Sequence, residues 1–459
     1  TSLAAQEYWD NHRALDYLLT RKDIDPERIG VYGSSGGGTQ TAYYIGLDPR
    51  VKVAAICSFF STRERTMELQ GPSDGCQHIP YEGREQLEVP DFALMMAPRP
   101  LLILSGKYDF VDLWGAQQGF AELQQCYKVL GVPEKVDMLT VETGHGLGVE
   151  KRQKLVSWFK RWLKDDQSPV KKAAQDRFQL SDMLCTTRGQ VNVSMPGALS
   201  IMQENVNQLD EWASKREAFL SKGKKTVQAK MLDLLGLKGL PDHKIRIEAT
   251  GHDSMREYEQ YKFQLIREGE MPVPCILIIP SRANADSPVE LRLQEEGKGT
   301  YLSEYANFAA ALTEGKILLL ADLRGLGETT DPAFYTDAKY WNREYRNAMI
   351  SMHIGRPIMG QRVVDILTLL DFCSEHEFLK GHSVKVFANG IYGPAAIHAA
   401  YLDERINSVE ITHSVKTWKE YIERPMQWDM YSNVLYGALK YYDLPDLIRL
   451  SNCPICFAD

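Results

Sequence analysis

Short apolar runs alternate with amphipathic helical segments through residues 1–165. The spacing of apolar side chains predicts helices over 7–20, 113–130 and 155–163. Four apolar runs predict buried strands at 29–34, 51–57, 99–104 and 135–141. Apolar strands separated by helices indicate a parallel sheet covered on both faces, so we expect an α/β fold. In such a sheet ligands bind outside the carboxyl ends of the strands.

Two stretches do not follow this alternation. The connection from 60 to 89 is long for a structureless loop and rich in Gly, Pro, Asp and Gln, so we expect it to overhang a site. Residues 166–240 are polar and lead into helical segments that carry Leu209, Trp212 and Leu220, which we interpret as a linker and a helical lead-in. The expected domains are therefore 1–165, 166–240 and 241–459.

Strand-like apolar runs resume after residue 240 and end by repeating the earlier pattern. They lie at 245–249, 261–267, 275–280, 289–293, 316–321, 384–389, 409–412 and 454–457. The strand, sharp turn and helix at 384–402 match those at 29–45, and a Leu-Asp-Glu-Arg-Ile run then stands where the first copy has Leu-Asp-Pro-Arg-Val. We infer an internal duplication, with the first copy present from its middle onward and the second up to its penultimate strand. We interpret the chain as a fragment of a longer protein.

Charge and composition exclude some classes of binding partner. The net charge of −8 in 459 residues, without a compensating basic patch, argues against a nucleic acid or an anionic membrane. The apolar runs are only strand-length, so we expect no membrane span. The one close cysteine pair, Cys453 and Cys456, lies on a strand-like run, and we expect buried cysteines there and no metal or redox site. No targeting segment is visible, and composition does not fix the compartment.

The sharpest motif is a Gly-x-Ser-x-Gly turn from Gly33 to Gly37, placed between a predicted strand and a predicted helix. In this context the motif makes a nucleophile elbow, which presents a serine hydroxyl at a helix N-terminus. We therefore predict that Ser35 is a catalytic nucleophile and that the N–H of Gly36 is one donor of an oxyanion hole. The Gly-x-x-x-x-Gly-Lys-Ser/Thr pattern of a phosphate-binding loop is absent.

A serine nucleophile needs a base, and the base needs an orienting acid. We favour His145, which lies between two glycines just after the fourth strand, over His78 in the long loop and His12 in the first helix. For the acid we favour Asp109, which follows the third strand. Its competitors are Asp112, Asp137 and Glu142. The resulting order, Ser35, Asp109, His145, is the order that α/β-hydrolases use.

The second copy lacks this chemistry. At its turn Gly390 stands in the place of the nucleophile, and the histidine of its last loop would lie beyond Asp459. We expect the remaining histidines to be structural or on the surface; they are His243, His252, His353, His376, His382, His398 and His413. We therefore expect a pseudo-hydrolase domain, and neither a metal nor another cofactor anywhere in the chain.

Several segments resemble bacterial acetylxylan-esterase-like α/β-hydrolases. They are residues 25–29, 33–39, 97–102, 158–163, 185–191 and 322–327. The resemblance implies a serine carboxylesterase that removes acetyl or other small acyl groups from carbohydrate, with Ser35 as nucleophile, His145 as base and Asp109 as its partner. It also implies a secreted or periplasmic bacterial protein. Sister families on this scaffold cleave peptides, lactones and other esters.

Two further functions stay open. A prolyl-oligopeptidase-type peptidase shares the fold, although no blade-length repeat of a gating propeller is present. A non-catalytic carbohydrate-binding scaffold is the other, with Trp341, Trp418 and Trp428 as sugar-stacking candidates, although we expect these tryptophans to be buried in the core. The expected partner is an acylated carbohydrate or another small ester, and the oligomeric state is not predicted.

Overall fold

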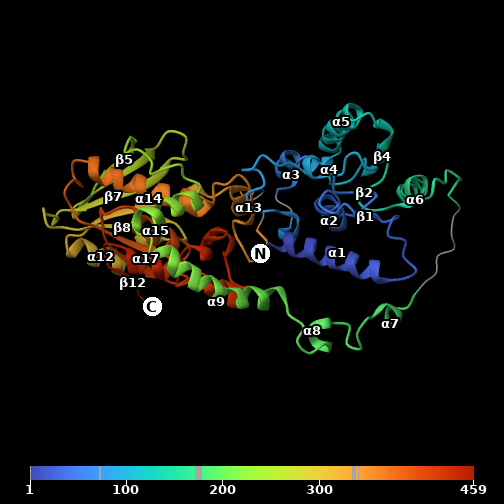
Figure 1. Ribbon diagram of the computed structural model, residues 1–459. Coiled ribbons are helices and arrows are strands. Elements are labelled where there is room, and N and C mark those ends of the chain that lie inside the picture. The colour runs from blue at the N-terminus through green and yellow to red at the C-terminus, as the bar shows by residue number, and fades with distance from the viewer. Residues whose placement is uncertain (1, 72–73, 171–177, 333–337, 340, 459) are drawn as a thin grey trace. The chain divides into compact units, whose positions relative to one another are not determined.

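The computed structural model describes residues 2–71, 74–170, 178–332, 338–339 and 341–458. The chain divides into two compact units, Thr1–Ile201 and Met202–Asp459. Figure 1 shows unit 1 from blue to green and unit 2 from green to red. Among the described residues, no helix combines the length and the apolar character that crossing a bilayer requires.

Unit 1 is built on a four-stranded parallel sheet in the order β1-β2-β3-β4, so the strand before Ser35 lies at one edge. The strands are β1 Gly30–Ser34, β2 Val53–Cys57, β3 Leu101–Gly106 and β4 Val136–Val141. The helices are α1 Leu3–Thr20, α2 Gly36–Ile45, α3 Arg63–Gln70, α4 Val89–Leu94, α5 Leu113–Val129, α6 Val149–Lys164, α7 Leu180–Met183 and α8 Val191–Ser194, with 3₁₀ turns Gly75–Gln77 and Pro133–Lys135. All four predicted strands of this unit are present.

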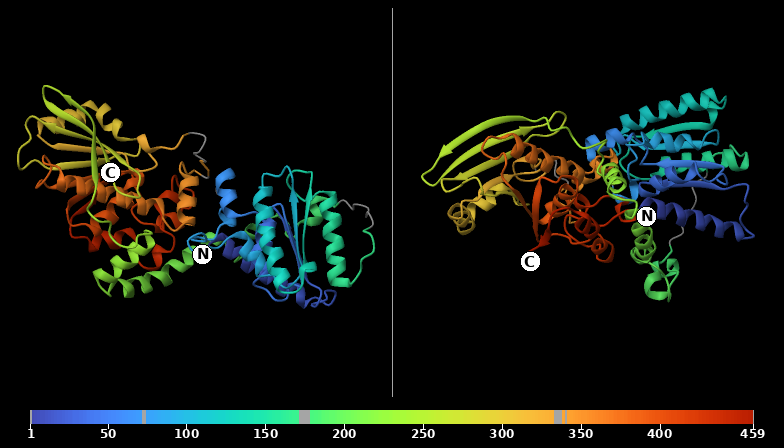
Figure 2. Two further views of the ribbon diagram at one scale, coloured as in Figure 1. Left: turned by 90° about the horizontal axis from the view of Figure 1, so that it is seen from above. Right: turned by 60° about the vertical axis from the view of Figure 1, so that its left-hand side comes forward.

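The two faces of this sheet are covered by different helices because successive strand residues point to opposite sides. In β2, Ala54 and Ile56 pack with side chains of α1, α2 and α5, whereas Val53 and Ala55 pack with α6. Figure 2 shows α6 and α5 on opposite sides of the strands. The predicted parallel sheet with two covered faces is confirmed for this unit.

Unit 2 contains an eight-stranded mixed sheet in the order β12-β11-β10-β8-β9-β7-β6-β5. The strands are β5 Arg246–Ser254, β6 Tyr258–Ile266, β7 Val273–Pro280, β8 Val289–Leu293, β9 Ile317–Ala321, β10 Val384–Asn389, β11 Ile406–Thr412 and β12 Ile455–Phe457. The strands from β12 to β9 pair in parallel, and β7, β6 and β5 extend the sheet antiparallel. With helices on both faces, this is an α/β-hydrolase-type fold.

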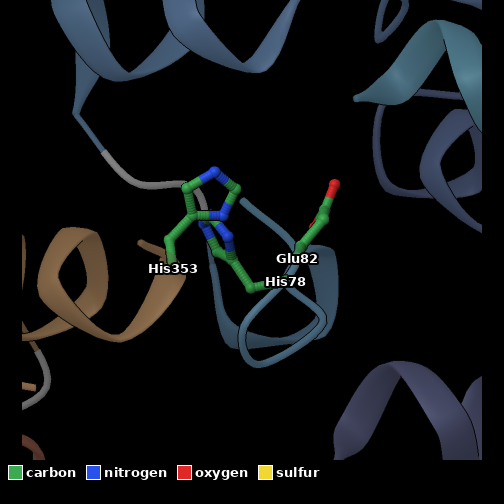
Figure 3. Close-up of side chains that lie close together, drawn as sticks. All are labelled: His78, Glu82 and His353. Atoms are coloured by element: carbon green, nitrogen blue, oxygen red, sulfur yellow. The ribbon is translucent and has the colours of Figure 1, made fainter. Parts of the chain in front are cut away.

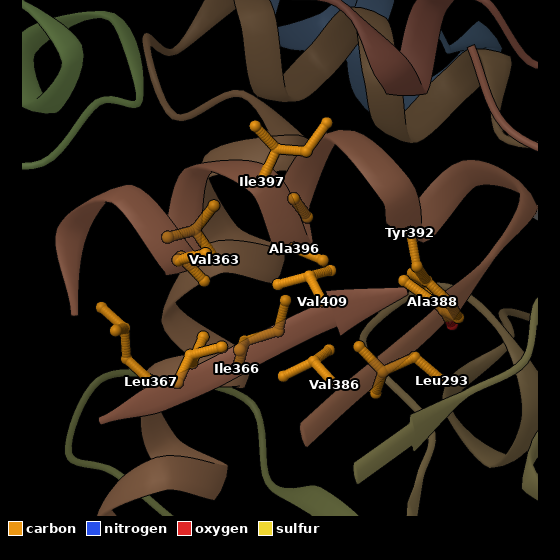
Figure 4. Packing of buried hydrophobic residues seen from close by; sticks show 14 of the residues in the cluster. Leu293, Val363, Ile366, Leu367, Val386, Ala388, Tyr392, Ala396, Ile397 and Val409 are labelled. Carbon is orange, nitrogen blue, oxygen red and sulfur yellow. The ribbon is translucent and has the colours of Figure 1, made fainter. Parts of the chain in front are cut away.

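The helices of unit 2 begin with the segment predicted as a helical lead-in. They are α9 Ile201–Leu220, α10 Lys224–Leu234, α11 Lys298–Ser303, α12 Tyr305–Thr313, α13 Tyr345–His353, α14 Ile358–Glu375, α15 Gly393–Leu402, α16 Lys419–Glu423 and α17 Leu444–Leu450, with 3₁₀ turns Gly327–Thr329, Gly390–Tyr392, Tyr431–Asn433 and Ala438–Lys440. Leu220 at the end of α9 is buried in the main core. Figure 4 shows the centre of that core, where Val363 and Ile366 of α14 and Ile397 of α15 lie over Val386 of β10.

The connection from 60 to 89, long for a structureless loop, contains α3 and a 3₁₀ turn. One sequence expectation about local structure is wrong, namely that Cys453 and Cys456 are buried. Cys456 is exposed and Cys453 is half-buried, since β12 is the last strand at its edge of the sheet. All eight cysteines have free thiols, so the described part of the chain contains no disulfide.

Candidate active site

The Ser35 turn has the geometry of a nucleophile elbow. Ser35 joins β1 to α2 with φ 58° and ψ −124°, in the left-handed region that side chains rarely adopt. A Cβ at Gly33 would overlap the carbonyl oxygen of Gly37, so the turn requires glycine there. The N–H of Ser35 donates to the carbonyl oxygen of Cys57 at 3.0 Å, which fixes the turn to the end of β2. Gly36 opens α2, and its N–H belongs to the helical turn that has no intrahelical acceptor.

Asp109 and His145 follow β3 and β4, and their side chains meet. Nδ1 of His145 lies 2.8 Å from Oδ1 of Asp109. The Asp109 side chain is only 1% exposed, whereas that of His145 is 29% exposed. The ring of Phe110 stacks on the imidazole, with 4.2 Å between centroids and 19° between planes. With Nδ1 engaged and one face covered, Nε2 is the ring nitrogen left for proton transfer.

The surroundings of Asp109 favour its ionised form. Burial is the largest influence and would raise the pKa of this carboxyl group, but hydrogen bonds outweigh it and lower the pKa below its ordinary value of 3.8. Oδ1 accepts hydrogen bonds from His145 at 2.8 Å and from the N–H of Val111 at 3.1 Å, and the nearby Ser58 hydroxyl also lowers the pKa. An ionised Asp109 can hold the Nδ1 proton of His145 and stabilise the imidazolium form.

Ser35, Asp109 and His145 all lie after carboxyl ends of strands of one parallel sheet. They follow β1, β3 and β4 respectively. Among the described residues, no hydrogen bond joins the hydroxyl of Ser35 to His145, whereas the contact between His145 and Asp109 is formed. Nucleophile–base bonds are often loose without substrate and tighten only in the complex. The structure therefore brings two of the three predicted residues into contact and places the third at the same edge.

The other histidines considered for unit 1 lie in different surroundings. His12 on α1 faces Asp48, with Nδ1 3.2 Å from Oδ2, in an ion-pair cluster. His78 is buried in the loop after α3 and is 3% exposed. Figure 3 shows His78 beside Glu82 of the same loop; His353, also drawn there, belongs to unit 2, whose position relative to this loop is not determined.

The carboxylates that compete with Asp109 have other partners. Asp112 accepts the N–H of Gly115 at 2.7 Å and caps α5. Asp137 pairs with Lys154 at 2.6 Å, and Glu142, whose side chain is 73% exposed, pairs with Lys107 at 2.6 Å.

The loop between β2 and α4 is anchored to the helix that follows the elbow. Arg63 is 1% exposed, and its Nη2 donates to the hydroxyl of Tyr43 in α2 at 2.7 Å and to the carbonyl of Gln77 at 2.9 Å. Glu82 is the buried acid that faces this arginine, at 3.4 Å. Burial raises the pKa of Glu82, although the neighbouring Arg63 opposes the shift. The buried cation Arg63, at the start of α3, thus joins the loop to Tyr43 of α2.

In unit 2 the turn after β10 has a φ at Gly390 similar to that of Ser35, and a carboxylate occupies the space beside it. Gly390 has φ 60°, against 58° for Ser35, and both follow a strand with parallel neighbours. A Cβ at Gly390 would overlap the carboxylate of Glu295, which comes just after β8. Oε2 of Glu295 accepts the N–H of Ile391 at 3.1 Å, the backbone donor that corresponds to Gly36. A side chain of unit 2 itself therefore occupies the space where a nucleophile and an oxyanion would lie.

The two units also share an Asp-x-Arg device after the helix that follows the turn. In unit 1, Nε and Nη2 of Arg50 donate to the two carboxylate oxygens of Asp48 at 2.8 and 2.6 Å. In unit 2, the same atoms of Arg405 donate to Asp403 at 3.0 and 2.6 Å. In each pair the arginine backbone N–H also donates to Oδ1 of the aspartate.

The tryptophans considered for sugar stacking are not all buried. Trp418 is 3% exposed and lies in the core, as expected, whereas Trp341 and Trp428 are 47% and 71% exposed. The N–H of Asp429, next to Trp428, donates to the carbonyl of Trp341 at 2.9 Å, so the two exposed tryptophans come from neighbouring segments. For these two the expectation of burial is wrong.

Comparison with known proteins finds similarity in the first unit. Residues 2–166 match the prolyl oligopeptidase family. This is a family of serine hydrolases, and the matched range contains Ser35, Asp109 and His145. YtaP of Bacillus subtilis (strain 168), which bears the name of a hydrolase, is 27% identical over 157 residues, 34% of this chain and 52% of YtaP.

A second relative and one solved structure extend the comparison. The lasso peptide isopeptidase AtxE2 of Asticcacaulis excentricus is 31% identical over 179 residues, 36% of this chain and 25% of AtxE2. The chain thus spans about half or less of the curated relatives that it matches. A structure from Bacteroides fragilis, assigned as an acetyl xylan esterase, is 14% identical with a TM-score of 0.46, over 57% of this chain and 75% of that one.

Proposed function

We propose that unit 1 is a serine ester hydrolase with Ser35 as nucleophile, His145 as base and Asp109 as the acid that orients the base. The observation that carries the proposal is the 2.8 Å hydrogen bond between Asp109 and His145. It lies on a sheet whose first strand ends in a strained serine turn. The chain order of the three residues is that of α/β-hydrolases.

The expected reaction has two stages. Nε2 of His145 takes the proton of Ser35 as its Oγ attacks the ester carbonyl, and the oxyanion accepts a hydrogen bond from the N–H of Gly36. Collapse of this intermediate expels the alcohol, which receives the proton from His145 and leaves an acyl group on Ser35. Water, deprotonated by His145, then attacks the acyl group; the bond to Oγ breaks, His145 returns the proton to Ser35, and the acid leaves. Throughout, Asp109 holds the Nδ1 proton and stabilises the imidazolium.

For the substrate we favour acetyl or other small acyl groups on carbohydrate. The support is the resemblance of the elbow and of the flanking segments to acetylxylan-esterase-like enzymes. Phe110 adds a physical reason, because its ring is 60% exposed beside His145 and offers a face on which a sugar can stack.

A peptidase or isopeptidase is the second candidate. It is favoured by the match of residues 2–166 to the prolyl oligopeptidase family and by the similarity to the isopeptidase AtxE2. The same nucleophile and base would attack an amide, so the site geometry does not separate the two reactions.

For unit 2 we propose a non-catalytic domain that arose by duplication. The matched backbone at Ser35 and Gly390 supports the duplication, as does the Asp-x-Arg device that both units contain. The glycine at the turn and the carboxylate of Glu295 beside it support the loss of catalysis. Trp341 and Trp428 are exposed, so carbohydrate binding is a candidate role for this unit.

A fluorophosphonate probe followed by peptide mapping tests the proposal for unit 1. We expect labelling at Ser35 in the full chain, and loss of both labelling and 4-nitrophenyl acetate hydrolysis in Ser35→Ala. Ser34→Ala, one residue earlier in the same turn, serves as the control and should retain both. Comparing 4-nitrophenyl acetate with an aminoacyl-proline 4-nitroanilide separates an esterase from a peptidase. Undiminished turnover in a folded Ser35→Ala variant would overturn the proposal.

A further inference from the structure

Two consecutive residues at the end of β2, Cys57 and Ser58, contact the elbow and the histidine loop respectively. Ser58 is 4% exposed, and its backbone lies in the left-handed region at φ 49°. Its hydroxyl oxygen accepts the N–H of Gly146, next to His145, at 3.1 Å. The preceding residue, Cys57, accepts the N–H of Ser35 at 3.0 Å. One short segment therefore connects the backbone at the predicted nucleophile to the backbone at the predicted base.

A buried lysine forms hydrogen bonds with this segment and with the histidine loop. Lys151 lies in the first turn of α6 and is 1% exposed, and its Nζ donates to Oγ of Ser58 at 3.2 Å and to the carbonyl of Gly146 at 3.0 Å. No carboxylate in the described part of the chain forms an ion pair with it. Burying a cation without a counter-ion costs free energy, and a cation at a helix N-terminus is disfavoured by the helix dipole. This arrangement therefore points to a role beyond packing.

The hydrogen bonds around Ser58 dictate where its own proton goes. A serine hydroxyl has two acceptor lone pairs and one proton. Gly146 and Lys151 donate to the oxygen, as does the thiol of Cys57 at 3.7 Å, so the proton is left to point elsewhere. The Ser58 hydroxyl also helps to lower the pKa of the Asp109 carboxyl group, although Oδ2 of Asp109 has no direct hydrogen bond among the described residues.

We propose that Ser58 and Lys151 are positioning residues, with Lys151 orienting the Ser58 hydroxyl and both side chains holding the Gly146 backbone next to His145. The imidazole of His145 is then fixed from two sides, through its hydrogen bond to Asp109 and through the backbone next to it. The kinetic part of this proposal rests on the proposed function of unit 1. A base misplaced by about 1 Å can cost a factor of about 100 in rate, so these contacts are expected to influence kcat.

The kinetic test replaces each residue by a side chain of similar volume without its polar group. For Ser58→Ala and Lys151→Met we expect kcat for 4-nitrophenyl acetate to fall about 10- to 100-fold, with KM within about twofold of wild type. Lys151→Arg keeps a cationic donor and should recover part of the loss. Lys154→Met is the matched control, because Lys154 lies on the same helix and pairs at the surface with Asp137. Folded Ser58→Ala and Lys151→Met variants with wild-type kcat would overturn the proposal.

A second readout does not depend on turnover. Exchange of the Gly146 backbone amide, followed by NMR in the ¹⁵N-labelled full chain, should be about tenfold faster in Ser58→Ala than in wild type. The reason is that the variant lacks the hydroxyl oxygen that accepts this N–H. If wild type neither hydrolyses esters nor labels at Ser35, the proposed function fails, while this exchange rate still tests the role of Ser58.

Folding is checked by near-UV circular dichroism. If Lys151→Met does not fold, the proposal is tested with Ser58→Ala alone, because that substitution removes a single oxygen atom. Unchanged exchange of the Gly146 amide in folded Ser58→Ala contradicts the proposal, whatever the activity of the wild type.

Discussion

The carboxylate of Asp109 and the imidazole of His145, 36 residues apart in sequence, are hydrogen-bonded at 2.8 Å. The aspartate is buried and the histidine is partly open to solvent, so a charge held inside the unit orients a ring that substrate can reach. The two residues follow adjacent parallel strands, β3 and β4, and this adjacency brings them together.

This relationship predicts the effect of Asp109→Asn. An amide in place of the carboxylate offers a donor as well as an acceptor and permits the wrong tautomer of His145, so we expect kcat to fall by about 10³- to 10⁴-fold with little change in KM. Steady-state hydrolysis of 4-nitrophenyl acetate measures it. Glu142→Gln, at the exposed end of β4, is the control and should leave kcat unchanged. A loss below about tenfold would show that Asp109 is not the orienting acid.

The elbow predicts opposite outcomes for two glycines in the same turn. A Cβ at Gly33 would overlap the Gly37 carbonyl, so Gly33→Ala should abolish fluorophosphonate labelling at Ser35 and destabilise unit 1 by about 1–3 kcal/mol. Gly37 lies within α2, and a Cβ there would have no heavy atom within 4 Å. Gly37→Ala should keep labelling and stabilise the helix by about 0.5–1 kcal/mol. Urea unfolding and probe labelling of both variants measure the contrast. Equal behaviour of the two variants would contradict the elbow geometry.

Burial of His398 in unit 2 predicts a pH dependence of stability. Burial lowers the pKa of His398 from 6.5 to about 4, so the unfolded chain binds the proton more tightly than the folded one. The stabilising contribution is complete above pH 6.5 and is lost as pH falls toward 4. Between pH 7 and pH 5 the loss is about 2 kcal/mol. Hydrogen exchange of the α15 amides at the two pH values measures it. His398→Gln should remove this part of the dependence, and an unchanged slope would contradict the assignment.

The sequence was sufficient for the parts of the site that depend on strand order. Ser35, Asp109 and His145 each follow an apolar run, and parallel strands bring such positions to one edge. Ser58 also follows a strand, but an isolated serine carries no motif. Its importance comes from a left-handed backbone and from partners that sequence spacing does not reveal.

Other features depended on contacts between distant segments. Lys151 resembles any charged residue at the start of a helix, and its burial follows from how α6 packs on β2 and β3. Glu295 lies 95 residues before Gly390, and nothing near it in sequence indicates that it fills the turn. The exposure of Trp428 was mispredicted because an apolar ring is by default assigned to a core.

The filled turn of unit 2 gives the last prediction. The backbone at Gly390 already has the φ of Ser35, so a serine is opposed there chiefly by the Glu295 carboxylate. Gly390→Ser should therefore destabilise unit 2 by about 1–3 kcal/mol, and adding Glu295→Gly should recover most of the loss. Gly437→Ser, at φ 82° with open space around the Cβ, measures the backbone cost alone. Urea unfolding followed by hydrogen exchange of β10 reports all three.

The same variants test whether unit 2 can regain a nucleophile. A serine at 390 without a base remains a weak nucleophile, and the Asp109–His145 pair belongs to unit 1. We therefore expect no fluorophosphonate labelling at position 390, even in the double variant with Glu295→Gly, while labelling at Ser35 persists in the same molecule as an internal control. Labelling at 390 would mean that unit 2 retains a working base and that its catalytic loss rests on the missing hydroxyl alone.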